Sequence, residues 1–156
     1  MGLVFGHPFF LKHTSLRDNL VILHRQQHRQ EHEQQEQQQQ TDDDKILQVL
    51  PRLKIDDVID RLDGLDSPLD ANRLSQGRRQ LLCIARAMLA GKGIILIDEA
   101  SSSVDERSER LIKDVMREQF ASCTVRAVAH RLGAVVDFDR VAVVYRYQIT
   151  KVYDGQ

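Results

Sequence analysis

The stretch LSQGRRQ (residues 74–80) stands directly before LLCIARAML (residues 81–89), in which apolar residues fill most positions. Serine and glycine ahead of such a run are residue types that end a turn and begin a helix. The pattern predicts a helix over residues 78–89 that is apolar over most of its surface and therefore largely buried. The chain continues into IILIDEASSSVD (residues 94–105) and later into AVAHRL (residues 127–132), so polar residues recur directly after apolar runs.

The part of the chain after this helix has the pattern of an α/β fold. GIILI (residues 93–97) is a short, continuous apolar run with β-branched residues, typical of a strand buried on both faces of a parallel sheet. Ser103 and Glu106 form a capping-box pattern, which predicts a helix that runs to about Phe120. Residues 124–129 are predicted to form the next strand. A strand, a helix and a strand at this spacing predict a right-handed crossover between parallel strands.

Residues 24–40 (HRQQHRQEHEQQEQQQQ) form a polar stretch of low complexity dominated by glutamine. In a helix, His24, His28 and His32 would share one face, an arrangement that could hold a metal ion. The composition favours a simpler interpretation, a Gln- and Glu-biased insert that cannot bury a core.

The segments on either side of the insert have helical patterns. One helix is expected to start near Thr14 or Ser15, and another at Thr41 or Asp42, with Pro51 interrupting it. A short amphipathic helix follows over residues 55–62, and then a loop over residues 63–73. We divide the chain into residues 1–23, the insert 24–41, a helical subdomain 42–73, and an α/β region 74–150.

The composition is that of a globular domain: 156 residues, 42% hydrophobic and 29% charged. A net charge of −1 gives no electrostatic basis for binding nucleic acid or an anionic membrane. No apolar stretch has the length of a membrane span, and the apolar start lacks a basic leader, so we expect no direct membrane insertion. Cys83 and Cys123 lie in apolar runs and are expected to be reduced thiols in a cytosolic setting.

Two carboxylates and a histidine follow predicted strands. Asp98 and Glu99 come directly after the apolar run, and His130 ends the next strand, so all three should lie at the carboxyl edge of the sheet. One carboxylate there could hold Mg²⁺ while the other accepts a proton from an attacking water. Each residue alone could equally be an ordinary strand end.

The Ser-Gln-Gly turn predicts an anion-binding site. Ser75 and Gly77 precede a long helix, whose unpaired N–H groups and positive dipole end form a cradle for phosphate. The alternative is an ordinary serine cap with a glycine in the turn.

Taken in order, LSQGRRQ, IILIDEASSSVD and AVAHRL closely resemble the signature motif, Walker B motif, D-loop and switch histidine of ATP-binding cassette (ABC) ATPases. PFFLKHTSLRDNL (residues 8–20) is similar to the segment that follows the Q-loop in ABC exporters. DEASSSVD together with AHRL resembles the multidrug-resistance-associated (C) subfamily, in particular its second nucleotide-binding domain. The resemblance implies a P-loop NTPase fold of parallel strands with a helical subdomain.

The resemblance also implies a role for each matching residue. Asp98 would serve Mg²⁺, Glu99 would be the general base, and His130 would contact the γ-phosphate of ATP. Asp105 would belong to the D-loop between two cassettes. The turn of Ser75, Gln76 and Gly77 would close on ATP held by a second nucleotide-binding domain, and the transmembrane domains of a transporter would be further partners, at the cytoplasmic face of a membrane.

The printed sequence also departs from the family pattern. It contains no G-x-x-x-x-G-K-[ST], the Walker A loop that binds the β- and γ-phosphates. Gly6 and His7 stand where the Q-loop has glutamine and an acidic residue. After a strand at residues 141–144, Tyr145 and Tyr147 replace the usual acidic residue and turn glycine, so we expect an eroded strand pair. The chain alone is therefore expected to bind ATP weakly, to hydrolyse none, and to be marginally stable.

Two other functions fit parts of the sequence. An ABC ATPase of DNA repair shares the signature and Walker B motifs, but residues 8–20, the AHRL ending and the absence of a heptad run argue against it. A non-catalytic interaction module would offer its LSQG turn to another cassette's ATP, or associate through the Gln-rich insert.

Overall fold

The computed structural model describes residues 2–4, 8–25, 32–98, 105–129 and 138–155. Within them the elements are β1 (Gly2–Val4), α1 (Leu16–Arg25), α2 (His32–Arg52), α3 (Asp57–Arg61), the 3-10 turn η1 (Ala71–Arg73), α4 (Gln76–Ala90), β2 (Ile94–Asp98), α5 (Glu106–Gln119), β3 (Thr124–Val128), β4 (Arg140–Tyr145) and β5 (Gln148–Asp154).

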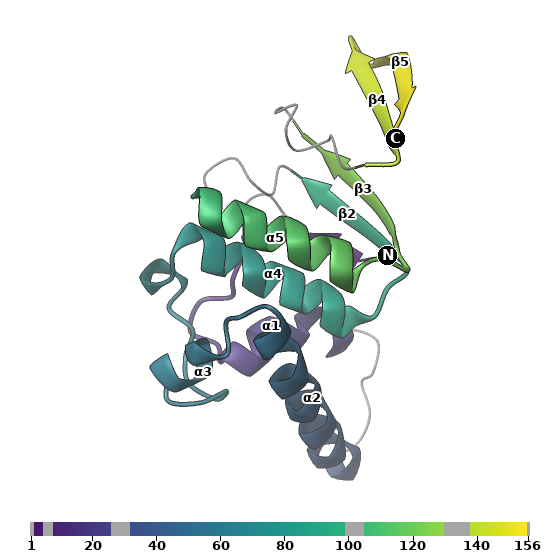
Figure 1. Cartoon of the computed structure of the whole chain (residues 1–156). Helices are drawn as coiled ribbons and strands as arrows, with labels where there is room; N and C mark the ends of the chain where they lie inside the picture. Colours follow the sequence, from purple (N-terminus) through teal and green to yellow (C-terminus); the bar gives the residue numbers. More distant parts are fainter. Residues whose placement is uncertain (1, 5–7, 26–31, 99–104, 130–137, 156) are drawn as a thin grey trace.

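A three-stranded parallel sheet in the order β1-β2-β3 joins the N-terminal strand to two strands of the second half (Figure 1). Helix α5 connects β2 to its parallel neighbour β3, and Ile94 pairs with Thr124 at one end and Asp98 with Val128 at the other. This confirms the predicted strand–helix–strand unit and the α/β fold class. Strand β1 was not predicted, because three residues are too few to show a periodic pattern.

Helix α4 is the most buried helix, as its apolar pattern predicted. Ser75 caps its start, Gly91 ends it in the left-handed conformation at φ 58°, and residues 80–87 are all buried. It packs against α1, α2, β1 and α5. Figure 1 shows α4 and α5 side by side on one face of the sheet.

The hydrophobic core lies mainly among the helices. Its fully buried members come from α1, α2, the α2–α3 connection, α4 and β2, and include Leu16, Leu20, Ile46, Leu50, Leu53, Ile55, Leu82, Ile84 and Ile95. Only Ile95 of strand β2 is fully buried, whereas Ile94 is 46% exposed and Val128 of β3 is 59% exposed. The prediction that β2 is buried on both faces was therefore wrong: α4 and α5 cover one face.

Helix starts agree with the sequence patterns at some positions and not at others. Helix α1 begins after Ser15, whose Oγ accepts a hydrogen bond from the N–H of Asp18 at 3.0 Å. Helix α2 begins at His32, inside the Gln-rich stretch, so the predicted cap at Thr41 or Asp42 was wrong. A run of glutamine and glutamate has good helix propensity and can extend a helix whose later turns are packed.

Two further details differ from the capping and turn predictions. Helix α5 starts at Glu106 and is capped by Asp105, and the predicted cap residue Ser103 lies outside the described residues. Pro51 lies in the last turn of α2 and does not interrupt it earlier.

Cys83 and Cys123 are both free thiols, as predicted, and burial raises the pKa of Cys83.

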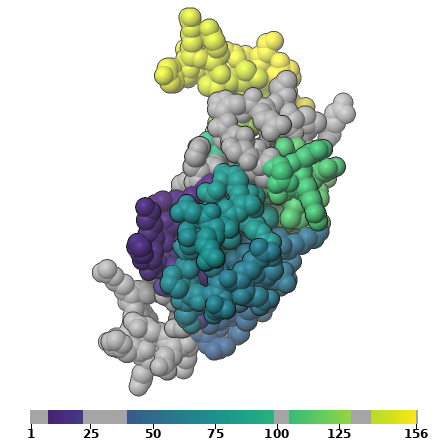
Figure 2. Space-filling model, turned by 90° about the vertical axis from the view of Figure 1, so that its left-hand side faces the viewer, coloured from purple at the N-terminus to yellow at the C-terminus, as the bar shows by residue number. Residues whose placement is uncertain are grey.

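Strands β4 and β5 form an antiparallel hairpin, so the expectation of an eroded strand pair was wrong. Its turn holds Arg146 and Tyr147 at φ 47° and 64°, a left-handed pair that usually requires Asn-Gly. The pairing continues to Arg140 and Asp154, whose side chains form an ion pair at 2.8 Å. Figures 1 and 2 show this hairpin at one end of the molecule, beyond the three-stranded sheet.

Candidate functional site

The first turn of α4 carries the predicted phosphate-binding residues. The Ser75 Oγ accepts a hydrogen bond from the backbone N–H of Arg78 at 3.3 Å, so Ser75 is a helix cap, and its side chain is exposed. Among the described residues, nothing accepts a hydrogen bond from the N–H of Gln76 or Gly77. Both interpretations of this turn therefore fit the geometry. Ser75 is an ordinary helix cap, and the N–H groups of Gln76 and Gly77 remain available as donors at the positive end of a long helix.

Asp98 is the last residue of β2 and is exposed. It pairs with Val128, the last residue of β3, so the chain leaves both strands at the same edge of the sheet. This is the carboxyl edge at which ligands bind in parallel α/β folds. Glu99 and His130, the other two predicted residues of this edge, lie outside the described residues.

Asp105 has a defined local role. Its side chain accepts a hydrogen bond from the N–H of Ser108 at 3.0 Å and caps α5. The hydrogen bonds from Ser108 lower the pKa of Asp105, so the carboxylate stays ionised at neutral pH. A charged cap at a helix N-terminus is favourable because it faces the positive end of the dipole.

The elements that carry the described ones among the predicted residues begin or end on the same side of the sheet. Helix α4 leads into β2 through three residues, so it runs opposite to β2 and starts near the carboxyl end of that strand. Figure 1 shows α4 and α5 beginning at the side to which the arrowheads of β2 and β3 point. Ser75, Gly77, Asp98 and Asp105 thus share one side of the molecule.

The residue types on this side suit a nucleotide and a hard cation. Free backbone N–H groups at a helix start bind phosphate, and an exposed carboxylate at a strand end is a ligand type that Mg²⁺ accepts. The described residues contain no group of three or more His, Cys, Asp or Glu side chains able to hold a metal ion by themselves. Asp98 would therefore need further ligands to hold Mg²⁺, such as water or phosphate oxygens.

Arg78, which follows the Ser-Gln-Gly turn, is held by helix α3. Its two terminal nitrogens lie 3.0 and 2.7 Å from the two carboxylate oxygens of Asp57, and Arg61 lies 2.9 Å from one of them. The hydrogen bond from Arg78 lowers the pKa of Asp57 below its ordinary value of 3.8. The ion pair is therefore complete at neutral pH and would be lost as the pH falls through this lowered pKa.

Arg86 connects α4 to the segment before α1. It is 5% exposed, and its Nε donates to the carbonyl oxygen of Asn19 at 2.5 Å while a terminal nitrogen donates to the carbonyl of Phe9. Another terminal nitrogen reaches Asn19 Oδ1 at 3.1 Å, and the guanidinium lies 4.5 Å from the centre of the Phe10 ring. Burial lowers the pKa of Arg86, but a guanidinium remains charged.

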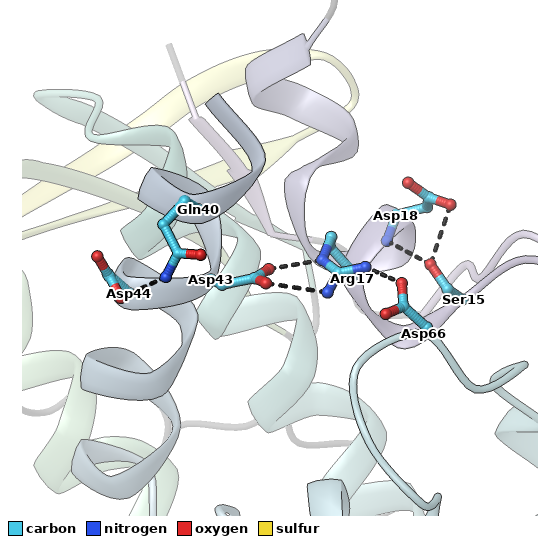
Figure 3. Close-up of polar contacts among 7 residues, drawn as sticks. All are labelled: Ser15, Arg17, Asp18, Gln40, Asp43, Asp44 and Asp66. Atoms are coloured by element: carbon cyan, nitrogen blue, oxygen red, sulfur yellow. Dashed lines mark hydrogen bonds and ion pairs between the residues drawn. The ribbon is translucent and has the colours of Figure 1, made fainter. Parts of the chain in front are cut away.

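Arg17 joins three segments of the helical part (Figure 3). Its Nε and one terminal nitrogen lie 2.5 and 2.9 Å from the carboxylate oxygens of Asp43 on α2, and the other terminal nitrogen contacts Asp66. The Arg17 side chain is 8% exposed, whereas Asp43 is 20% and Asp66 79% exposed. The arginine thus ties α1 to α2 and to the loop before η1.

These arginine contacts were not predicted from the sequence. A single arginine inside a helix that is otherwise apolar indicates a buried partner. Arg86 inside LLCIARAML is such a residue, and Arg17 inside TSLRDNL gives a similar indication. The partners themselves lie far along the chain and were not predictable from spacing.

The chain is similar to known transporter proteins. The family model described as "ABC transporter" matches residues 1–102. The ABC transporter gloK of Glarea lozoyensis is 39% identical over 136 residues, which is 87% of this chain and 9% of that protein. ABC transporter ecdL of Aspergillus rugulosus is 41% identical over 87% of this chain and 8% of that protein. ATP-binding cassette sub-family C member 4 of Homo sapiens is 39% identical over 65% of this chain and 8% of that protein.

The fold and the family model identify part of a nucleotide-binding cassette of the P-loop NTPase class. The chain belongs to the ABC transporter family, because the family model covers more than half of it. Its relatives include members of the C subfamily, which it resembles. The chain spans less than a tenth of the length of the curated relatives named above. Among the described helices, none has the length and apolar character needed to cross a bilayer.

Proposed function

We propose that this chain supplies the signature half of a composite ATP site and needs a second cassette with a Walker A loop to complete it. The observation that carries the proposal is the start of α4, where Ser75 caps the helix and the N–H groups of Gln76 and Gly77 have no acceptor among the described residues. Such a turn binds phosphate oxygens brought by another polypeptide or domain.

In this proposal, the residues act at two nucleotide positions. The start of α4 faces ATP held by the second cassette, and the residues at the carboxyl edge of the sheet face the nucleotide position of this chain. Ser75, Gln76 and Gly77 donate hydrogen bonds to the triphosphate. At the sheet edge of this chain, Asp98 would hold Mg²⁺, which lowers the charge on the phosphates.

Two further residues at the same sheet edge would act on the reacting water and phosphate. Glu99 accepts the proton of the attacking water, and His130 donates a hydrogen bond to the terminal phosphate. Asp105 keeps the start of α5 in place beside the second cassette, since it caps that helix.

The wider setting follows from the same proposal. As part of a transporter, the cassette would lie at the cytoplasmic face of a membrane, next to transmembrane domains whose movement is driven by ATP hydrolysis. By itself the chain would be cytosolic and would act as a binding partner for another cassette.

Association with a second cassette tests the proposal. We expect the chain to bind a Walker A-bearing cassette of the C subfamily in the presence of ATP and Mg²⁺, and Ser75→Arg to weaken binding at least about tenfold, because a bulky cation replaces the cap and blocks the approach of phosphate. The dissociation constant, measured by fluorescence anisotropy with and without ATP, is the readout.

Ser122→Arg is the matched control for this experiment. Ser122 is exposed and lies just beyond α5, at the end opposite to Asp105, so the same charge and bulk are added away from the site. If binding needs no ATP, or if Ser75→Arg and Ser122→Arg behave alike, the composite site does not exist.

The isolated chain is expected to show no Mg²⁺-dependent ATP hydrolysis. The printed sequence has no Walker A loop, and that loop and its lysine provide most of the donors for the β- and γ-phosphates. Phosphate release by the purified chain should equal that of its Glu99→Gln variant, which lacks the proposed general base. A metal-dependent rate that Glu99→Gln abolishes would refute this prediction.

A further inference from the structure

Helix α3 contacts the start of α4 through one ion pair. Asp57 is the first residue of α3, and its two carboxylate oxygens receive the two terminal nitrogens of Arg78 at 3.0 and 2.7 Å. This two-point geometry fixes the plane of the guanidinium as well as its distance.

The carboxylate itself is held in position from its own helix. Arg61, one turn further along α3, lies 2.9 Å from Asp57 Oδ2. The Asp57 side chain is 41% exposed and that of Arg78 is 27% exposed, so the pair is shielded mainly on the arginine side. A partly shielded pair with two-point contact differs from a simple surface ion pair, which usually contributes little.

Arg78 joins this ion pair to the Ser75 cap. Its side chain is bound to Asp57, while its backbone N–H donates to Ser75 Oγ at 3.3 Å. The N–H of Arg79 donates to the Ser75 carbonyl at 3.0 Å. Any rotation of the first turn of α4 must therefore either move Arg78 away from Asp57 or carry α3 with it.

We propose that Asp57 is a positioning residue for the phosphate-facing turn of α4, acting through Arg78. It keeps Ser75, Gln76 and Gly77 in the conformation that receives phosphate, and directs the Arg78 guanidinium toward α3. Holding these groups in place before binding reduces the entropy lost when the nucleotide arrives. This inference rests on the proposed function, since it concerns the same composite site.

The first test measures ATP-dependent binding to the Walker A-bearing cassette. Asp57→Asn keeps the shape of the side chain and removes its charge, and is expected to weaken binding about fivefold, the effect of losing a well-placed ion pair. Arg61→Ala removes the other cation beside Asp57 but no contact with α4, and should change binding less than about twofold.

A double substitution distinguishes positioning through Arg78 from a general loss of structure. If Asp57 acts through Arg78, Asp57→Asn should have no further effect on binding in an Arg78→Met background. Equal effects of Asp57→Asn in both backgrounds would overturn the proposal.

The second readout does not depend on a partner. In the chain alone, hydrogen exchange of the Arg78 and Arg79 amides should be about fivefold faster in Asp57→Asn than in Arg61→Ala, while the amides in the middle of α4 stay unchanged. If the unaltered chain fails to bind the second cassette, the proposed function is wrong, and exchange alone decides the role of Asp57. Identical exchange in the two variants overturns that role.

Discussion

Replacing Arg86 by alanine is expected to lower the free energy of unfolding by about 3–5 kcal/mol. The change removes three hydrogen bonds to Phe9 and Asn19 and leaves a cavity where the guanidinium lay against Phe10. A loss of this size is comparable to the whole stability of a marginally stable domain, so the variant should lack a cooperative urea transition by far-ultraviolet circular dichroism at 25 °C.

Two further variants separate the contribution of the cavity from that of the lost hydrogen bonds and test whether burial of the arginine matters. Arg86→Met fills most of the cavity but restores no donor, and we expect it to lose about 1–3 kcal/mol, the cost of carbonyl groups left without partners. Arg110→Ala removes an exposed arginine whose one ion pair with a described residue is to Glu106, one turn away, so it should cost less than about 0.5 kcal/mol. A stable Arg86→Ala variant would show that the buried guanidinium costs as much to desolvate as its contacts return.

Arg17→Met is expected to lower the free energy of unfolding by about 2–3 kcal/mol. The substitution keeps the apolar stem and removes the charge that faces Asp43 and Asp66 (Figure 3). Most of the loss should come from Asp43, because it is only 20% exposed and would keep an unpaired charge. The α2 amides near Asp43 should exchange faster than those of α4.

The hairpin supplies a matched control for Arg17. Arg140 and Asp154 also form an arginine–aspartate pair, at 2.8 Å, but both side chains are more than 70% exposed. Arg140→Met should therefore change the free energy of unfolding by less than about 1 kcal/mol. Equal losses in the two variants would mean that burial does not increase the contribution of the Arg17 pair.

The helices of the second half were the most predictable part of the fold. Leu81 to Ala87 are apolar except for Arg86, and a helix with that pattern can only be buried. The Gln-rich stretch was harder to predict, because it has no apolar stripe of its own and is the beginning of a helix whose later residues, such as Ile46 and Leu50, are buried.

For the hairpin of β4 and β5, the sequence predicted less regular structure than the protein forms. Tyr147 in place of a turn glycine suggested a lost strand pair, because a positive φ is costly for a residue with a Cβ atom. The pair forms nonetheless, with Arg146 and Tyr147 both in the left-handed region. The strand pairing from Arg140 to Asp154 offsets the local cost of the two left-handed residues, and the turn sequence alone does not show this compensation.

The sequence by itself determined the family, the position of Ser75 at the start of α4, and the place of Asp98 at the end of β2, because these depend on local patterns and on the order of elements. The tertiary structure alone decided which groups meet across long separations: Arg78 with Asp57, Arg17 with Asp43, and Arg86 with Phe9 and Asn19. The physical reason is that a charged side chain in a core must find a partner, and that partner is set by how the helices pack.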